Sequence, residues 1–125
     1  MKTSMFIGRF QPFHDGHKAL IDSVLNEGNN IVIALRHTPI QKTDPYTIME
    51  RFNMIKKVYP EAVMYPSDSR VVVCAIPDIS EICYGRKVGW GIRQIHLDKE
   101  IEDISATKIR LNSDNRLKDS KSKRN

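Results

Sequence analysis

Two histidines, His14 and His17, stand three residues apart near the start of the 125-residue chain, with Asp15 and Gly16 between them. If a helix begins near Asp15, both imidazoles point the same way at its N-terminus. Free backbone N–H groups and the positive end of the helix dipole attract anions there. Gly16 leaves no side chain in the path of a phosphate, and an imidazole can donate a hydrogen bond to oxygens that gain charge during group transfer. The motif therefore indicates phosphate chemistry.

Other interpretations of this motif are a helix cap, a surface histidine or half of a zinc site. The zinc interpretation lacks further ligands, because His37 and His96 lie far along the chain and no HExxH sequence or CxxC pair accompanies them. We therefore expect no metal bound by protein side chains. A dinucleotide held by a G-x-G-x-x-G loop is also not expected, because bulky residues separate Gly8 from Gly16.

A second motif, ISATKIR, occupies residues 104–110. Ser105 is a natural N-cap, and Thr107, Lys108 and Arg110 fall in the first turns of the helix that it would start. Alone, this segment would be a capped helix with its cations in water. Paired with the two histidines, it supplies hydroxyls, amides and cations for further phosphates.

The elements that must position these motifs alternate along the chain. Apolar runs at residues 4–8, 31–35 and 71–76 predict buried strands, and helical spacing predicts helices over residues 18–27 and 47–59. Residues 94–97 predict a further strand, and residues 105–112 a last short helix. This alternation predicts a single α/β domain, a doubly wound Rossmann-like parallel sheet with helices on both faces. Ligands of such sheets bind at the carboxyl ends of the strands, which is where the histidine motif lies.

Composition limits the partners. The hydrophobic fraction of 40% suits one domain, which we place at residues 1–112. The net charge of +5 lies mostly in residues 113–125, which hold five basic and two acidic residues and read as a disordered tail, so we expect no nucleic-acid partner. No run approaches the roughly 20 apolar residues of a membrane span, and no secretory leader is recognisable. We expect a cytoplasmic protein without a membrane partner.

Taken together, the motifs resemble those of the nucleotidylyltransferases that carry H-x-G-H after the first strand and a late I-S-S/G-T-x-x-R sequence. Ala106 replaces the usual Ser, Thr or Gly of the late motif. Residues 44–51, DPYTIMER, resemble the N-P-F-T-x-x-E-R segment of the archaeal-type nicotinamide mononucleotide adenylyltransferases, and residues 8–13 and 76–79 are similar to the same branch. The resemblance covers nearly the whole chain apart from the tail.

The resemblance implies transfer of a nucleoside monophosphate, with AMP favoured, from a nucleoside triphosphate to a phosphorylated small-molecule acceptor. Pyrophosphate leaves, Mg²⁺ is bound with the triphosphate, and no covalent enzyme intermediate forms. It assigns catalysis to His14, His17 and Arg110. It assigns nucleotide binding to Gly8, Arg9, Phe10, Gly16, Arg51, Ser105 and Thr107. A surface or structural ion-pair role stays open for Arg9 and Arg51.

The acceptor is less constrained. Residues 79–104 are fewer than in the archaeal-type enzymes, and this stretch is glycine-rich and basic, with Tyr84, Arg86 and Trp90 offering aromatic surface and a cation to a phosphorylated acceptor. The chain length is closer to that of glycerol-3-phosphate cytidylyltransferase, so CTP stays open as the donor beside ATP. A non-catalytic nucleotide-binding domain and a homo-oligomer also stay open. A fragment of a class I aminoacyl-tRNA synthetase is disfavoured, because no K-M-S-K-S loop occurs.

Overall fold

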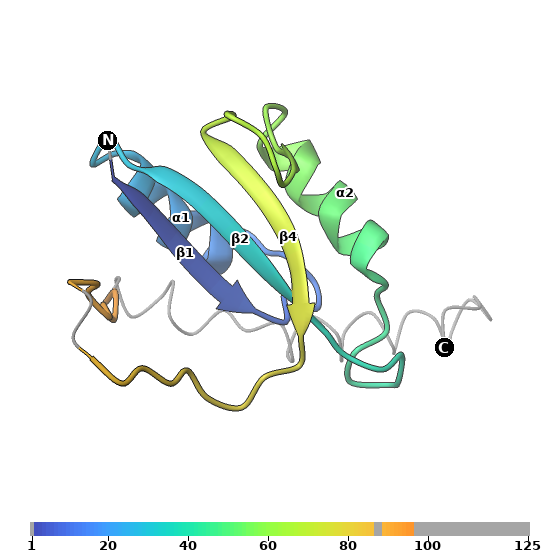
Figure 1. Ribbon diagram of the computed structural model, residues 1–125. Helices are drawn as coiled ribbons and strands as arrows, with labels where there is room; N and C mark the ends of the chain where they lie inside the picture. The colour runs from blue at the N-terminus through green and yellow to red at the C-terminus, as the bar shows by residue number, and fades with distance from the viewer. Residues whose placement is uncertain (1, 87–88, 97–125) are drawn as a thin grey trace.

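The computed structural model of the chain describes residues 2–86 and 89–96, and these form one sheet of four parallel strands with two helices. The elements are β1 (Thr3–Gly8), α1 (Asp15–Leu25), β2 (Asn30–His37), α2 (Ile48–Val58), β3 (Val63–Met64) and β4 (Val71–Pro77). The strands lie in the order β1-β2-β4-β3, and Figure 1 shows the three longer ones side by side. The Rossmann-like α/β fold expected from the sequence is confirmed.

The three long strands are the three that the apolar runs predicted, each extended by one or two residues at one or both ends. Residues of neighbouring strands stand opposite one another, with Gly8 of β1 beside Leu35 of β2 at the last rung of that pair. Strand β3 was not predicted, because two residues carry no periodic pattern.

Helix α1 begins at Asp15, three residues before the predicted start of the periodic pattern, so that it includes the histidine motif. It ends at Leu25, two residues before the predicted end, and Gly28 then adopts φ of 89° while its N–H donates to the carbonyl of Leu25. Helix α2 begins with a capping box formed by Thr47 and Glu50. Thr47 accepts from the N–H of Glu50 at 3.0 Å, and the Glu50 carboxylate accepts from the N–H of Thr47 at 2.9 Å.

The hydrophobic core lies between the sheet and the two helices. Its fully buried members include Ile33 of β2, Ile21 of α1 and Ile55 of α2. The end of α2 is also joined to α1, since the hydroxyl of Tyr59, the residue that follows α2, donates to Asp22 of α1 at 2.7 Å. Both described helices therefore cover the same face of the sheet (Figure 1). This is expected, because α1 connects β1 to β2 and α2 connects β2 to β3 in the same direction across the sheet, and right-handed connections in one direction place their helices on one face.

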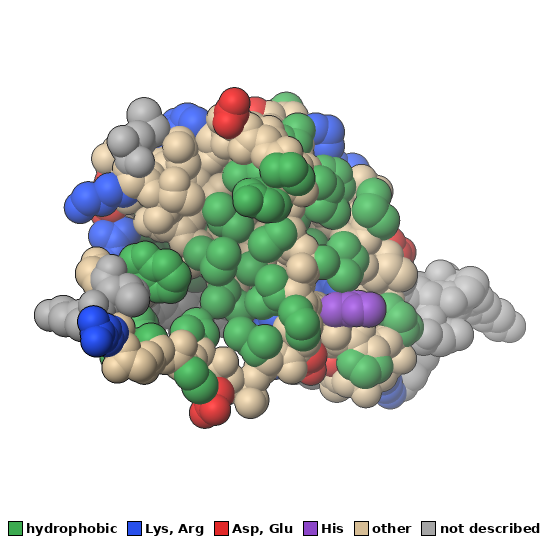
Figure 2. All heavy atoms as spheres, in the orientation of Figure 1, with side chains coloured by type: hydrophobic (Ala, Val, Ile, Leu, Met, Phe, Trp, Pro, Cys, Tyr) green, Lys and Arg blue, Asp and Glu red, His purple; other side chains and the backbone are tan. Residues whose placement is uncertain are grey.

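The opposite face of the sheet carries apolar side chains as well. Met5 and Ile7 alternate with core-facing residues of β1 and are 55% and 39% exposed, and Figure 2 shows hydrophobic side chains gathered over this face. The expectation of helices on both faces is not met within the described residues, because α1 and α2 both pack on the other face. The helix predicted over residues 105–112 and the tail at 113–125 lie outside the described residues.

The further strand predicted over residues 94–97 is wrong for its described part, because residues 94–96 form no strand. Ile95 packs against the core while its neighbours Gln94 and His96 are exposed, and Arg93 is held by Glu27 at 3.0 Å. The packing of Ile95 and the ion pair between Arg93 and Glu27 hold this segment, rather than the hydrogen bonds of a strand. Among the described residues, no helix is long and apolar enough to cross a membrane.

Candidate functional site

The loop that joins β1 to α1 carries the candidate site at the carboxyl end of β1. Phe10 in this loop has φ of 50°, a left-handed conformation that costs a bulky residue free energy and persists only where its surroundings enforce it. Its ring is only 6% exposed and lies edge-on to the His17 imidazole, with centroids 4.7 Å apart. Gly8 makes room for this ring, because a Cβ on Gly8 would stand 3.2 Å from two of its atoms. Phe10 is thus a support beneath His17.

His14 and His17 cap helix α1 reciprocally. The backbone N–H of Gly16 donates to Nδ1 of His14 at 3.0 Å, and the backbone N–H of His14 donates to Nδ1 of His17 at 3.1 Å. The two rings stack with centroids 3.7 Å apart and planes 21° apart. A pair of imidazoles therefore performs the task that Ser or Thr with Glu performs at ordinary helix starts.

Both imidazoles are neutral at physiological pH. Burial, followed by the neighbouring His14, lowers the pKa of His17 to about 3. Burial lowers the pKa of His14 as well, against a smaller opposing effect of Asp15. Because Nδ1 of each ring accepts a backbone N–H, the proton of each neutral ring is on Nε2. The helix start thus carries two Nε2–H donors, each polarised by a backbone hydrogen bond on its other nitrogen.

Arg9 lies on the same loop and is held by Asp44, which follows β2. Its Nη1 is 3.1 Å from Oδ1 of Asp44, and the side chains are 42% and 4% exposed respectively. The Asp44 carboxylate also accepts hydrogen bonds from Gln41 at 2.8 Å and Thr43 at 3.2 Å. The buried carboxylate anchors one edge of the guanidinium and leaves the rest open to a ligand.

Arg51, in the first turn of α2, is fully buried. Its guanidinium donates to the carbonyls of Arg9 at 2.7 Å, Arg36 at 2.8 Å and Thr47 at 3.2 Å. Burial lowers its pKa, with Asp44 opposing the effect. The resemblance assigned Arg51 to the nucleotide, whereas in this structure its Nε and Nη1 donate to backbone oxygens beneath the surface.

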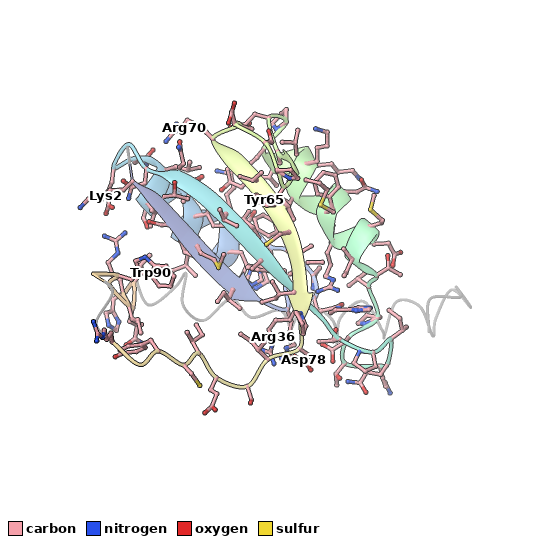
Figure 3. The ribbon with its side chains drawn as sticks, in the orientation of Figure 1. Lys2, Arg36, Tyr65, Arg70, Asp78 and Trp90 are labelled. Carbon is pink, nitrogen blue, oxygen red and sulfur yellow. The ribbon has the colours of Figure 1, made fainter. Side chains whose placement is uncertain are left out.

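Sequence patterns did not identify three further polar residues at this end of the sheet, Gln11, Arg36 and Asp78. Gln11 is fully buried and exchanges hydrogen bonds of 2.9 Å with both the carbonyl and the N–H of Tyr46. Arg36 pairs with Asp78 at 2.6 Å across the ends of β2 and β4, and Figure 3 shows these two side chains together there. Their positions in the sequence could have indicated them, because each lies near or just after the carboxyl end of a strand in the same parallel sheet.

A family model described as cytidylyltransferase-like matches residues 5–73, which is more than half of the chain. The chain belongs to the cytidylyltransferase-like family. The match includes the histidine pair, Arg9, Asp44 and Arg51. The late motif at 104–110 lies beyond it.

Curated relatives are similar over part of this chain. The nicotinamide-nucleotide adenylyltransferase of Methanocorpusculum labreanum is 39% identical over 59 residues, or 46% of this chain and 35% of that protein. The enzyme of the same name from Caldivirga maquilingensis is 35% identical over 81 residues, or 63% of this chain and 44% of that protein. The chain thus spans well under half the length of these relatives.

A solved structure is also similar. The bifunctional NMN adenylyltransferase/ADP ribose pyrophosphatase of Francisella tularensis, complexed with AMP and a manganese ion, is 29% identical with a TM-score of 0.50. The alignment covers 62% of this chain and 23% of that protein.

Within this family member, the structure brings together only part of the predicted site. His14, His17, Gly8, Arg9 and Phe10 share the loop after β1 and the start of α1, together with Gly16. The predicted late-motif residues Ser105, Thr107 and Arg110 lie outside the described residues.

The predicted acceptor residues Tyr84, Arg86 and Trp90 are all exposed, with Trp90 at 83%. Figure 3 shows Trp90 well apart from Arg36 and Asp78 at the strand ends. Among the contacts of the described residues, none joins these three to the histidine pair. Their role as acceptor contacts stays a prediction.

Proposed function

We propose that the protein is a nucleotidyltransferase that transfers AMP from ATP to a phosphorylated small-molecule acceptor and releases pyrophosphate. The observation that carries this proposal is the pair of neutral imidazoles at the start of α1. Their Nδ1 atoms are taken by backbone N–H groups at 3.0 and 3.1 Å, so their Nε2–H groups are committed to donation. Two fixed neutral donors at the positive end of a helix suit a polyphosphate.

The proposed reaction needs no covalent bond to the protein. An oxygen of the acceptor phosphate forms a bond to the α-phosphorus of ATP, while the bond from that phosphorus to the oxygen bridging to the β-phosphate breaks. The bridging oxygen gains negative charge and leaves with pyrophosphate. Catalysis then consists of positioning and charge stabilisation. His14 and His17 supply neutral donors, and Arg9, held by Asp44, supplies a cation.

ATP is favoured over CTP as the donor because the matching relatives are adenylyltransferases by name and the similar solved structure holds AMP. Nicotinamide mononucleotide is accordingly the first acceptor to test. Mg²⁺ enters with ATP as part of the substrate. Ser105, Thr107 and Arg110 complete the phosphate contacts in this proposal, and Tyr84, Arg86 and Trp90 serve the acceptor.

The test is pyrophosphate release from ATP or CTP with Mg²⁺, measured against a panel of acceptors that includes nicotinamide mononucleotide and glycerol 3-phosphate. We expect release with ATP only when a phosphorylated acceptor is present. Faster release with CTP would favour the cytidylyltransferase alternative. Tight ATP binding by calorimetry with no release across the panel would mean a nucleotide-binding domain without turnover, and would reject the proposal.

A further inference from the structure

The buried guanidinium of Arg51 continues the pairing of β1 and β2 beyond the last rung of their ladder. That rung joins Gly8 to Leu35, and the next residues along the two strands are Arg9 and Arg36. Nη1 of Arg51 donates to both of their carbonyls, at 2.7 and 2.8 Å. Carbonyls at the carboxyl ends of parallel strands have lost their ladder partners, and buried ones must find another donor. Arg51 donates to both carbonyls, and the Arg36 carbonyl accepts from the backbone N–H of Thr38 at 3.1 Å as well.

The carbonyl of Arg9 belongs to the peptide bond that precedes Phe10, the residue with φ of 50°. A left-handed phenylalanine requires neighbours that hold its backbone. The bond from Arg51 at 2.7 Å holds the peptide on one side of Phe10, and the ring packs over Gly8 on the other.

The Phe10 ring transmits this constraint to the histidine pair. Its centroid lies 4.7 Å from that of His17 in an edge-on arrangement, and 5.9 Å from that of Phe13, which itself contacts His17. A rotation of the peptide between Arg9 and Phe10 would swing this ring. His17 would then lose the support that aligns its Nδ1 with the N–H of His14.

We propose that Arg51 is a positioning residue that fixes the peptide between Arg9 and Phe10, and through the Phe10 ring the orientation of His17, without touching the nucleotide. The structural part of this proposal stands on the contacts above. Its consequence for turnover rests on the proposed function.

Arg70 provides a matched control. Its Nη2 also donates to two carbonyls, those of Leu25 at 2.8 Å and Asn29 at 2.9 Å. Figure 3 shows Arg70 at the end of the sheet opposite Arg36. Arg70→Lys therefore removes another guanidinium that bridges two backbone carbonyls, at a place far from the histidines.

The experiment compares Arg51→Lys with Arg70→Lys in the full chain. Lysine keeps the charge of Arg51 but lacks the rigid planar group in which Nε donates to the Thr47 carbonyl while Nη1 donates to those of Arg9 and Arg36. Nitrogen-15 NMR of the imidazoles reports the tautomer of His17 without requiring activity. We expect wild type and Arg70→Lys to show His17 fixed with its proton on Nε2, and Arg51→Lys to show a tautomer mixture. The same tautomer in all three proteins would overturn the proposal.

Turnover and affinity separate positioning from contact. In Arg51→Lys we expect kcat to fall about tenfold or more while the Kd for ATP, measured by calorimetry, changes less than about threefold. A Kd that rises tenfold together with the fall in kcat would mean that Arg51 contacts the triphosphate, which would also overturn the proposal. If wild type releases no pyrophosphate, the proposed function fails while the tautomer measurement still decides the role of Arg51.

Should Arg51→Lys not fold, Phe10→Leu tests the second link of the chain. Leucine fills the apolar space but removes the ring edge against His17. We expect the same loss of a fixed His17 tautomer in this variant. A folded Phe10→Leu protein with an unchanged His17 would refute transmission through the ring.

Discussion

The backbone N–H of His14 donates to Nδ1 of His17 at 3.1 Å, while Nδ1 of His14 accepts from the N–H of Gly16. One histidine thus orients the other, and the same hydrogen bonds that cap α1 decide which nitrogen carries the proton. Stability of the helix start and chemistry of the site are consequently linked in two side chains, and substitutions can separate them.

His17→Asn should separate the two roles. The asparagine carbonyl oxygen stands near the place of Nδ1 and can still accept from His14, whereas the distal donor is lost. We expect turnover to fall by about two orders of magnitude or more with little change in thermal stability. His17→Ala should lose turnover equally and also about 1 kcal/mol of stability, because the cap is broken. Calorimetric melting and pyrophosphate release check both variants, and normal turnover in His17→Asn would remove the donor from the mechanism.

Acid should destabilise the fold through His17. Its pKa is about 3 in the folded protein against an ordinary value of 6.5, so between these values the unfolded chain binds a proton that the folded chain does not. Stability is therefore fully present above pH 6.5 and decreases as pH falls toward 3, with a limiting slope of about 1.4 kcal/mol per pH unit for this proton.

Urea unfolding between pH 7.5 and 5 measures this slope. His17→Asn, which has no imidazole at this position, serves as the control and should show a shallower decrease. Equal slopes in the two proteins would mean that His17 titrates normally in the folded state.

The position of the site could be predicted from the sequence because it depends on short patterns. The interpretation of His14 and His17 depended on a helix that begins near Asp15, as α1 does, and the apolar run before them predicted a strand that ends at Gly8. A helix cap was one interpretation of the motif, but its reciprocal form could not be predicted, since histidine is not among the residues that usually cap helices.

Burial of the polar residues could not be predicted either. Arginine and glutamine are exposed by default, and Arg51 and Gln11 are buried because backbone groups distant in sequence offer them partners. Arg51 bonds to a carbonyl 42 residues away, and Gln11 to a backbone 35 residues away. These backbone partners come close to Arg51 and Gln11 only when the chain folds, so the sequence does not reveal them.

Gly8→Ala should disturb the support beneath His17. The added Cβ would stand 3.2 Å from two atoms of the Phe10 ring, which is enclosed by Phe13 and His17 and has little room to move. We expect a loss of about 1 to 3 kcal/mol in the free energy of unfolding, together with reduced turnover. Gly85→Ala is the matched control, because its Cβ would meet nothing within 4 Å. Urea unfolding compares the two, and equal stabilities would show that the Phe10 ring yields without cost.

Gln11→Glu should expose the importance of the buried amide that joins the two loops of the site. The substitution keeps the acceptor for the N–H of Tyr46 but replaces the Nε2 donor, which lies 2.9 Å from the Tyr46 carbonyl, with a carboxylate oxygen. A charged oxygen facing a carbonyl in a fully buried position should cost about 2 kcal/mol or more at pH 7.5. Because a protonated glutamic acid regains a donor, the loss should shrink as pH falls toward 5. Urea unfolding at the two pH values measures this, with Gln94→Glu as the same change on an exposed residue. A loss no larger than that of Gln94→Glu would show that the bond between Gln11 and the Tyr46 carbonyl contributes little to holding the loops together.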